Sequence, residues 1–274
     1  MPELPEVETI LRSLEAKALG QVIRKVTVIH EKTIRKPHPD VFVSCLQGQE
    51  ITGFNRLGKY LMMEIGCSKV LVIHLRMTGR LIYTESSIPV TKHTRIIFYL
   101  DQGQELHFQD IRKFGTMHLL RRQELQSFPP FRALGYDALD PRLSLDIFIN
   151  MLKGRRGQVK GLLLNQSFIA GIGNIYANEI LWKAGIHPQR TANSLDIEEQ
   201  QKLYQAIRDV LKSAVSHRGT TLRDYVDGDG KHGEFQNLLR VHSREGKPCP
   251  LCGNSIARIK QGGRSSYYCP ICQK

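Results

Sequence analysis

The C-terminal end of the sequence carries four cysteines in two matched Cys-x-x-Cys pairs that are separated by sixteen residues. The four are Cys249, Cys252, Cys269 and Cys272. Two such pairs can place four thiolates tetrahedrally around one Zn²⁺, and since the protein then fills every ligand position, the metal is structural. The stretch between the pairs reads as a β-hairpin with Gly262-Gly263 at its tip. We therefore predict a zinc ribbon that holds this hairpin rigid.

The hairpin is basic, and so is the whole chain. The hairpin carries Arg258, Lys260 and Arg264, which can contact a partner. The 274 residues include 39 Lys and Arg against 26 Asp and Glu, a net charge of +13 with a pI near 9.6. With four zinc-bound thiolates the net charge is still about +11. This excess predicts a polyanionic partner, nucleic acid first and an anionic membrane surface second. An amphipathic basic helix long enough for the second is not evident in the sequence.

Compartment signals in the sequence favour the cytoplasm. No apolar run approaches the length of a membrane span, and the first residues are acidic and helical, unlike a signal peptide. Cysteines in that compartment are reduced or bind metal. Cys45 and Cys67 lie far apart in apolar, strand-like surroundings, which predicts small buried side chains.

Hydrophobic periodicity predicts a first helix and then a β-rich region. Apolar residues from Leu4 to Ala18 recur at helical spacing, and Gly20 can end that helix, which carries Pro2 at its tip. Short β-rich runs separated by turn residues follow, and they predict a β-sandwich of about eight strands. These runs are 22–29, 51–65, 70–77, 81–83, 95–100, 105–108 and 117–120.

The second half of the sequence is predicted to be helical. A Pro-rich irregular stretch at 127–141 marks a linker. The helical patterns beyond it are 145–152, with Ser144 as a plausible N-cap, then 157–164, 175–184 and 197–216. Residues 219–233 are rich in Gly and Asp and are predicted to be mobile.

The chain begins Met1-Pro2-Glu3-Leu4-Pro5-Glu6. Methionine aminopeptidase removes Met1 efficiently before a small residue, proline included, so the mature chain would begin with a secondary amine beside two carboxylates. Such an amine attacks an aldehyde-like carbon and leaves a cationic iminium, the electron sink that elimination chemistry on a sugar requires. The alternative is an ordinary N-terminus, because many chains begin Met-Pro.

Lys59 is a candidate proton-transfer group. Strand alternation places it in phase with apolar residues such as Leu61 and Met63, so its ammonium is partly desolvated. A lysine that snorkels at a strand edge is the alternative interpretation.

Two further spots combine apolar side chains with cations. Met77 ends a strand just before a turn, where most methionines are core filler. Residues 111–115 place Arg112, Lys113 and Phe114 in a loop after a strand. An exposed aromatic between cations suits wedging into stacked bases. A buried Phe114 with solvated neighbours is the alternative.

In the helical half, a Gly-x-Gly turn at 171–173 separates two helical patterns. Its glycines allow close backbone approach, Asn174 is a good N-cap, and helix N-termini attract phosphate. Three cations lie shortly upstream and can extend the positive surface. They are Arg155, Arg156 and Lys160. An ordinary turn between helices is the alternative.

Together, MPELPEVE at the start, GIGNIYANE in the middle and a zinc ribbon closing with CPICQK resemble the bacterial formamidopyrimidine-DNA glycosylase family from end to end. The endonuclease VIII branch shares the architecture but typically starts with PEGPE. Leu4, together with Met77, Arg112 and Phe114, favours the branch that acts on oxidised purines.

The resemblance implies catalytic roles for five residues. Pro2 would be the nucleophile that attacks C1′ and forms the iminium. Glu3 would serve as the acid–base group, and Glu6 would help organise that site. Lys59 would donate a proton in β-elimination and Arg264 in δ-elimination.

The resemblance also implies contacts with DNA. Met77, Arg112 and Phe114 would fill the gap left by the extruded nucleotide, with Arg112 pairing with the orphaned cytosine. Backbone contacts would come from His93, Arg155, Arg156, Lys160, Asn174 and Arg264. Residues 219–233 match the loop that closes over the flipped base.

The implied fold is a two-domain α+β protein. An N-terminal β-sandwich with flanking helices would span residues 1–130 and a linker 131–141. A helix-two-turn-helix domain would follow at 142–235, and the zinc ribbon at 236–274. One departure from the family is His242-Ser243, where relatives usually carry Tyr-Gly. We hypothesise that a protonated His242 replaces the tyrosine as a phosphate contact and makes DNA binding pH-sensitive.

The predicted function is a monomeric, bifunctional DNA glycosylase and apurinic/apyrimidinic lyase of base excision repair. It would bind double-stranded DNA, carry one structural Zn²⁺, and remove 8-oxoguanine and ring-opened purines. One alternative is an endonuclease VIII-like enzyme for oxidised pyrimidines. The other is a non-catalytic zinc-ribbon protein that binds damaged DNA.

Overall fold

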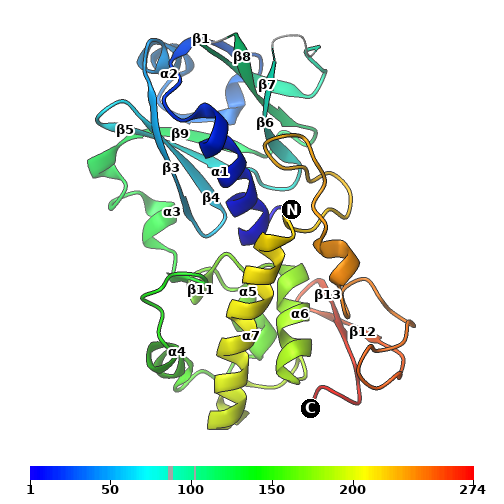
Figure 1. Cartoon of the computed structure of the whole chain (residues 1–274). Helices are drawn as coiled ribbons and strands as arrows, with labels where there is room; N and C mark the ends of the chain where they lie inside the picture. Colours follow the sequence, from blue (N-terminus) through cyan, green and yellow to red (C-terminus); the bar gives the residue numbers. More distant parts are fainter. Residues whose placement is uncertain (86–88, 102) are drawn as a thin grey trace. The chain divides into compact units, whose positions relative to one another are not determined.

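The computed structural model describes residues 1–85, 89–101 and 103–274 (Figure 1). These residues form two compact units. Unit 1 comprises Met1–Arg132 and His217–Gln236, and unit 2 comprises Ala133–Ser216 and Asn237–Lys274. Within the described ranges, every helix is too short or too polar to cross a membrane.

Unit 1 is built around two β-sheets. The first has the antiparallel order β1-β7-β8-β6, with strands Ile23–Val28, Thr94–Leu100, Gln104–Asp110 and Gly79–Glu85. The second has the order β2-β9-β5-β4-β3, with strands Ile34–Lys36, Thr116–Arg121, Lys69–His74, Tyr60–Ile65 and Ile51–Leu57. Its pairs are antiparallel except for β2 with β9.

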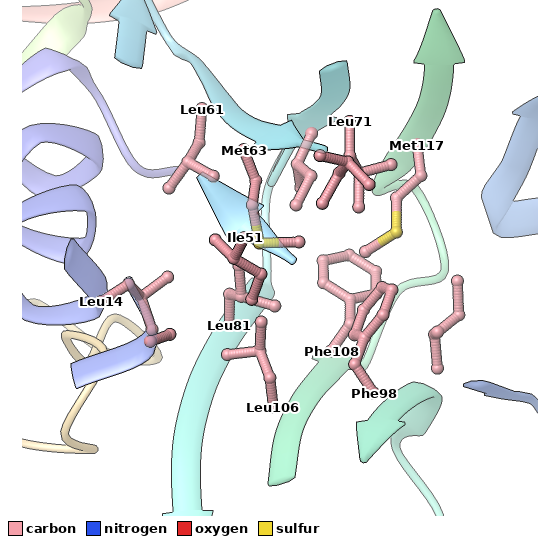
Figure 2. Close-up of a cluster of buried hydrophobic side chains, with 14 of the residues drawn as sticks. Leu14, Ile51, Leu61, Met63, Leu71, Leu81, Phe98, Leu106, Phe108 and Met117 are labelled. Carbon is pink, nitrogen blue, oxygen red and sulfur yellow. The ribbon is translucent and has the colours of Figure 1, made fainter. Parts of the chain in front are cut away.

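The main core of unit 1 lies between these sheets (Figure 2). Alternate residues of β4 are buried, as expected for a strand with one face on the core. Leu61 and Met63 on that face lie opposite Phe98 and Phe108 of the other sheet, and these side chains form the layer between the two sheets. Helix α1 (Leu4–Ala18) contributes Leu14 to the same cluster. The sandwich predicted from the sequence is confirmed.

The predicted run 51–65 is in fact a hairpin of two strands. Gly58 and Lys59 form the turn between β3 and β4, and Gly58 has a φ of +58°, a conformation that glycine adopts readily. Short helical elements complete the unit. They are Glu31–Thr33 (η1), Pro39–Leu46 (α2), Arg122–Glu124 (η2) and Pro129–Arg132 (α3).

Unit 2 is mainly helical and ends in a hairpin. Its helices are α4 (Leu145–Leu152), α5 (Val159–Leu164), α6 (Asn174–Ala184), α7 (Ile197–Ser216) and the short η3 (Ala192–Ser194). Ser144 caps α4 by accepting a hydrogen bond from the Ile147 N–H at 3.3 Å. Apolar residues at helical spacing on α7 are buried, as the periodicity predicts. The 3₁₀ turn η4 (Phe235–Leu238) lies where the chain passes from one unit to the other.

The predicted linker and the predicted hairpin both have defined structure. Within the linker, β10 (Tyr136–Asp137) pairs in parallel with β11 (Ile169–Ala170), and Ala138 is fully buried. At the C-terminal end, β12 (Ala257–Gln261) pairs with β13 (Arg264–Tyr268) around Gly262 and Gly263, as predicted.

Candidate functional site

The start of α1 gathers the acidic residues of the N-terminal motif. Glu3 is the N-cap, and Pro5 occupies the first turn, where its fixed φ favours helix initiation. The Glu3 N–H donates to Glu6 Oε2 at 2.7 Å, one half of a capping box. Pro2, Glu3 and Glu6 are all buried. The three predicted residues therefore lie together at one helix tip.

A distant segment of the chain also reaches this tip. The Thr220 N–H donates to Glu6 Oε1 at 2.7 Å. A Cβ added to Gly219 would lie 2.7 Å from the same oxygen, and the φ of Gly219 is +76°. Only glycine fits here, because a side chain would meet the carboxylate and strain the backbone. Glu6 thus joins the first turn of α1 to residues 219–220.

The rest of the 217–236 segment lies along α1 and bonds to it at several points, and its mobility stays a prediction (Figure 1). The Gly228 N–H donates to Ser13 Oγ at 3.0 Å, and its carbonyl accepts from the Tyr83 N–H at 2.8 Å. Lys17 pairs with Asp229 at 2.7 Å, and the buried Asp227 pairs with Arg218. The segment therefore belongs structurally to unit 1, whereas the sequence grouped it with the helical half.

Lys59 lies in the β3–β4 turn and is only 7% exposed. Arg56, three residues before Lys59, pairs with Glu8 of α1 at 2.8 Å. This ion pair joins the β3–β4 hairpin to the helix that carries the N-terminal motif. Burial of the lysine agrees with the predicted desolvation of its ammonium.

His74, a residue that the sequence motifs do not single out, is a neighbour of Lys59. Burial, followed by the charges of Arg76 and Lys59, lowers the pKa of His74 to about 3. Its Nδ1 accepts a hydrogen bond from the Arg76 N–H at 3.0 Å, so the neutral ring carries its proton on Nε2. The clue to His74 in the sequence is its place at the end of an apolar strand, just before the turn that contains Arg76.

Met77 and Phe114 are exposed apolar side chains, at 41% and 50%. The guanidinium of Arg112 lies 4.8 Å from the centroid of the Phe114 ring, a cation–π contact. The Arg112 N–H donates to Thr78 Oγ1 at 3.0 Å, so the turn after β5 and the β8–β9 loop (111–115) are adjacent. His93 is at the base of this loop, because its carbonyl accepts from the Asp110 N–H at 2.9 Å.

Unit 2 brings a second group of predicted residues together. Asn174 Nδ2 donates to the Ser265 carbonyl at 3.1 Å, beside Arg264 on the hairpin. Asn174 is the first residue of α6 and not its N-cap as predicted, because Gly173 has the extended backbone of that position. Arg155 and Arg156 follow α4 and are exposed.

Lys160 differs from the prediction of a DNA contact. Its side chain is 1% exposed, and its Nζ donates to the Ser265 carbonyl at 3.0 Å and to Ser266 Oγ at 2.8 Å. The ammonium therefore supports β13 from inside unit 2. A lysine in a basic stretch gives no sign in the sequence of an acceptor 105 residues away.

His242 also differs from the hypothesis of a protonated phosphate contact. The side chain is 8% exposed, its Nδ1 lies 2.7 Å from Asn178 Nδ2, and its ring packs against Tyr267. Burial, followed by the charge of Lys160, lowers the pKa of His242 to about 4. The imidazole is therefore neutral across the range of about pH 5.5 to 8 in which an exposed histidine titrates.

Glu179 holds residues 240–242, which precede the zinc ribbon in the chain. Its carboxylate accepts hydrogen bonds from the N–H groups of Arg240, Val241 and His242 at 2.8, 3.1 and 2.8 Å. Burial raises the pKa of Glu179 even though these three donors lower it. Three donors on one buried acceptor make residues 240–242 a rigid part of unit 2.

The four cysteine sulfurs of the C-terminal pairs all lie within 4.8 Å of one another. Cys249 and Cys272 are 3.9 Å apart and Cys252 and Cys269 3.5 Å apart. Zinc–sulfur bonds of 2.3 Å at tetrahedral angles require sulfurs about 3.8 Å apart. The residues therefore fit one Zn²⁺, as predicted.

The two remaining cysteines lie elsewhere. Cys45 on α2 is partly buried, whereas Cys67, in the turn between β4 and β5, is exposed. The prediction of a buried side chain is wrong for Cys67, because apolar residues on both sides of it belong to two different strands.

Three family models together match most of the chain. The formamidopyrimidine-DNA glycosylase N-terminal domain matches residues 1–117, and the H2TH domain of the same family matches residues 134–226. A zinc finger found in FPG and IleRS matches residues 246–274, which include the four clustered cysteines.

Relatives agree along the full length. The formamidopyrimidine-DNA glycosylase of Desulforamulus reducens is 49% identical, covering 100% of this chain and 99% of the relative. That of Pelotomaculum thermopropionicum is 46% identical with the same coverage. The wild-type Fpg of Lactococcus lactis, solved with N7-benzyl-Fapy-dG DNA, is 33% identical with a TM-score of 0.93 over 100% of both chains. The same protein solved with abasic DNA gives 0.93 over 99% of both. The chain therefore belongs to the formamidopyrimidine-DNA glycosylase family.

Proposed function

We propose that the chain is a DNA glycosylase of base excision repair that removes oxidised and ring-opened purines from duplex DNA and then acts as a lyase on the abasic strand. The observation that carries the proposal is the tip of α1, where the buried Pro2 and Glu3 lie beside Glu6 and Thr220. Support comes from full-length relatives that bear the glycosylase name and from the solved complexes of Lactococcus lactis Fpg with Fapy-dG and abasic DNA.

In this proposal the secondary amine of Pro2, freed by removal of Met1, attacks C1′ of the damaged nucleoside. The bond from C1′ to the base breaks, the sugar ring opens at O4′, and nitrogen and C1′ are left joined as an iminium cation. Glu3 transfers the protons that the departing base and O4′ require. Glu6 keeps Glu3 in place through the main-chain hydrogen bond at the helix start.

The iminium then drives strand cleavage. It acidifies the C2′ hydrogen, and loss of that proton expels the 3′ phosphate, after which a second elimination expels the 5′ phosphate. Lys59 and Arg264 are the proton donors for the first and second eliminations. Bound Zn²⁺ supplies folding free energy to the hairpin that carries Arg264.

Base extrusion leaves a gap in the duplex, and three exposed side chains are proposed to fill it. Met77 and Phe114 occupy the vacated space, and Arg112 pairs with the orphaned cytosine. Extruding a nucleotide costs a few kcal/mol, which these contacts offset. His93, Arg155, Arg156 and Asn174 are proposed to contact the DNA backbone.

Borohydride trapping on a panel of duplexes tests this function. Each duplex carries one lesion: 8-oxoguanine opposite cytosine, a formamidopyrimidine, an oxidised pyrimidine or none. Borohydride reduces an imine to a stable covalent bond, so we expect crosslinks and phosphate-ended nicks mainly with the purine lesions. The pyrimidine duplex is included because the Lactococcus lactis Fpg has also been solved with oxidised pyrimidine DNA. Faster reaction there favours the endonuclease VIII-like alternative, and binding without crosslinks or nicks favours a non-catalytic protein.

Arg156 and Lys160 are expected to affect DNA binding in different ways. Arg156→Ala removes an exposed cation, so the slope of log affinity against log salt is expected to shrink by about 0.9 with an unchanged Tm. Lys160→Met leaves the Ser265 carbonyl and Ser266 without the ammonium, so Tm falls by several degrees and DNA binds more weakly at an unchanged slope. Fluorescence anisotropy over a salt series, with thermal melts, measures both. A smaller slope at unchanged Tm for Lys160→Met would show that Lys160 meets phosphate directly.

A further inference from the structure

We propose that Asp110 is the positioning residue that holds Arg112 and Phe114 ready to enter the duplex. The inference rests on the proposed function, because it concerns how the gap-filling side chains keep their geometry. Asp110 is the last residue of β8 and is 1% exposed, so its carboxylate cannot itself reach DNA.

The Asp110 carboxylate accepts three hydrogen bonds from two loops. Oδ1 accepts from Thr78 Oγ1 at 2.5 Å and from the Arg112 N–H at 3.1 Å. Oδ2 accepts from the Gly115 N–H at 2.7 Å. One side chain therefore bonds to both ends of the β8–β9 loop and to the residue that follows Met77.

The main chain of Asp110 is equally fixed. Its N–H donates to the His93 carbonyl at 2.9 Å, and its carbonyl accepts from Arg95 Nε at 2.8 Å. Arg95 is buried at 6% exposed. Both the backbone and the carboxylate of Asp110 are anchored by hydrogen bonds. Asp110 therefore fixes the β8–β9 loop relative to the sheet that contains β8.

The loop needs such an anchor. Lys113 has a φ of +59° and Arg76, beside Met77, a φ of +55°, both in the left-handed region that costs a non-glycine residue energy. Phe114 and Met77 are also held exposed to solvent, where an unrestrained loop would fold apolar side chains inward. Because Met77 and Phe114 already have fixed positions before DNA binds, binding does not pay the entropy cost of ordering them.

The chemistry of the site requires a carboxylate. Three donors converge on Asp110, and an ionised carboxyl group accepts at both oxygens. The isosteric Asn would accept at one oxygen and turn its amide N–H₂ group towards a donor. Asp110→Asn therefore keeps the shape of the side chain and removes part of its bonding. Thr78→Val is the matching change at one of the three donors. It keeps the volume but removes the hydroxyl that donates to Asp110 and accepts from the Arg112 N–H.

The experiment compares Asp110→Asn and Thr78→Val with wild type and with Asp101→Asn. Asp101 follows β7 and pairs with Arg24 at 4.0 Å, so the control makes the same charge change away from Asp110 and its partners. The first readout is the ratio of kcat/KM for 8-oxoguanine opposite cytosine to that opposite adenine, which depends on Arg112. The second is borohydride trapping on a single-stranded abasic oligonucleotide, which has no opposite base. The third is Tm.

We expect both variants to lower the ratio by about tenfold or more, because each loses at least one well-placed buried hydrogen bond, while single-strand trapping stays at the wild-type level. An unchanged ratio overturns the proposal. A parallel loss of trapping and Tm also overturns it, because Asp110 would then serve only fold stability. If wild type itself fails to trap, the proposed function fails instead. In that case, 2-aminopurine fluorescence opposite an abasic analogue still reports whether the variants change insertion of Phe114.

Discussion

A chain carrying two extra residues ahead of Pro2 is expected to lose base excision and borohydride trapping by on the order of 10⁴-fold, as enzymes do when a nucleophile is removed. The extension turns the secondary amine into a tertiary amide, whose nitrogen has no free lone pair for C1′. Single-turnover cleavage of 8-oxoguanine duplex and crosslink yield on abasic DNA measure the loss.

The control is the same two residues added after Lys274, which leaves the amine of Pro2 free. Mass spectrometry of both proteins establishes which N-terminus is present. Because Pro2 and Glu3 are buried at the helix tip, the extension also needs a test of folding, and an unchanged Tm supplies it. Full activity of the N-terminally extended protein would contradict a role for this nitrogen.

Replacing Cys269 by Ser is expected to release zinc and to weaken DNA binding by on the order of 100-fold. Cys269 is fully buried, and its N–H donates to Gln273 Oε1 at 2.8 Å, so loss of the metal leaves the base of the hairpin unsupported. Lys160 and Asn174 then lose the ordered Ser265 carbonyl that they share. Metal content by atomic absorption and affinity for a duplex with an abasic analogue measure the two effects.

Cys67→Ser is the matched control, because that cysteine is exposed in a turn of unit 1 and is not one of the four clustered thiols. It should keep the metal and the wild-type affinity. A Cys269→Ser protein that binds DNA normally without zinc would show that the hairpin is stable on its own core alone.

Local patterns predicted the elements of this fold well, because each depends on neighbours in the sequence. Helices α4 and α7 have the predicted bounds, and the Cys-x-x-Cys spacing predicted both the ribbon and its hairpin. Phase with the apolar residues of β4 likewise predicted a buried Lys59, although the residue lies in the turn and not in the strand.

The roles of single side chains depended on partners that the sequence places far away. Thr220 and Glu6 are separated by 214 residues, Lys160 and Ser266 by 106, and Asp110 and Thr78 by 32. A charged residue in a basic or Gly-rich stretch looks solvated until its acceptor is known. For this reason Lys160 resembles a DNA contact in the sequence, and nothing next to Asp110 marks it as the shared acceptor of two loops.

The bond between Glu6 and Thr220 has a consequence for biosynthesis. The amine proposed as the nucleophile is made first, yet residues 219–220, which bond to Glu6 beside it, leave the ribosome only after most of the polypeptide has been translated. The N-terminal motif of a nascent chain therefore lacks its Glu6–Thr220 bond until synthesis has passed residue 220.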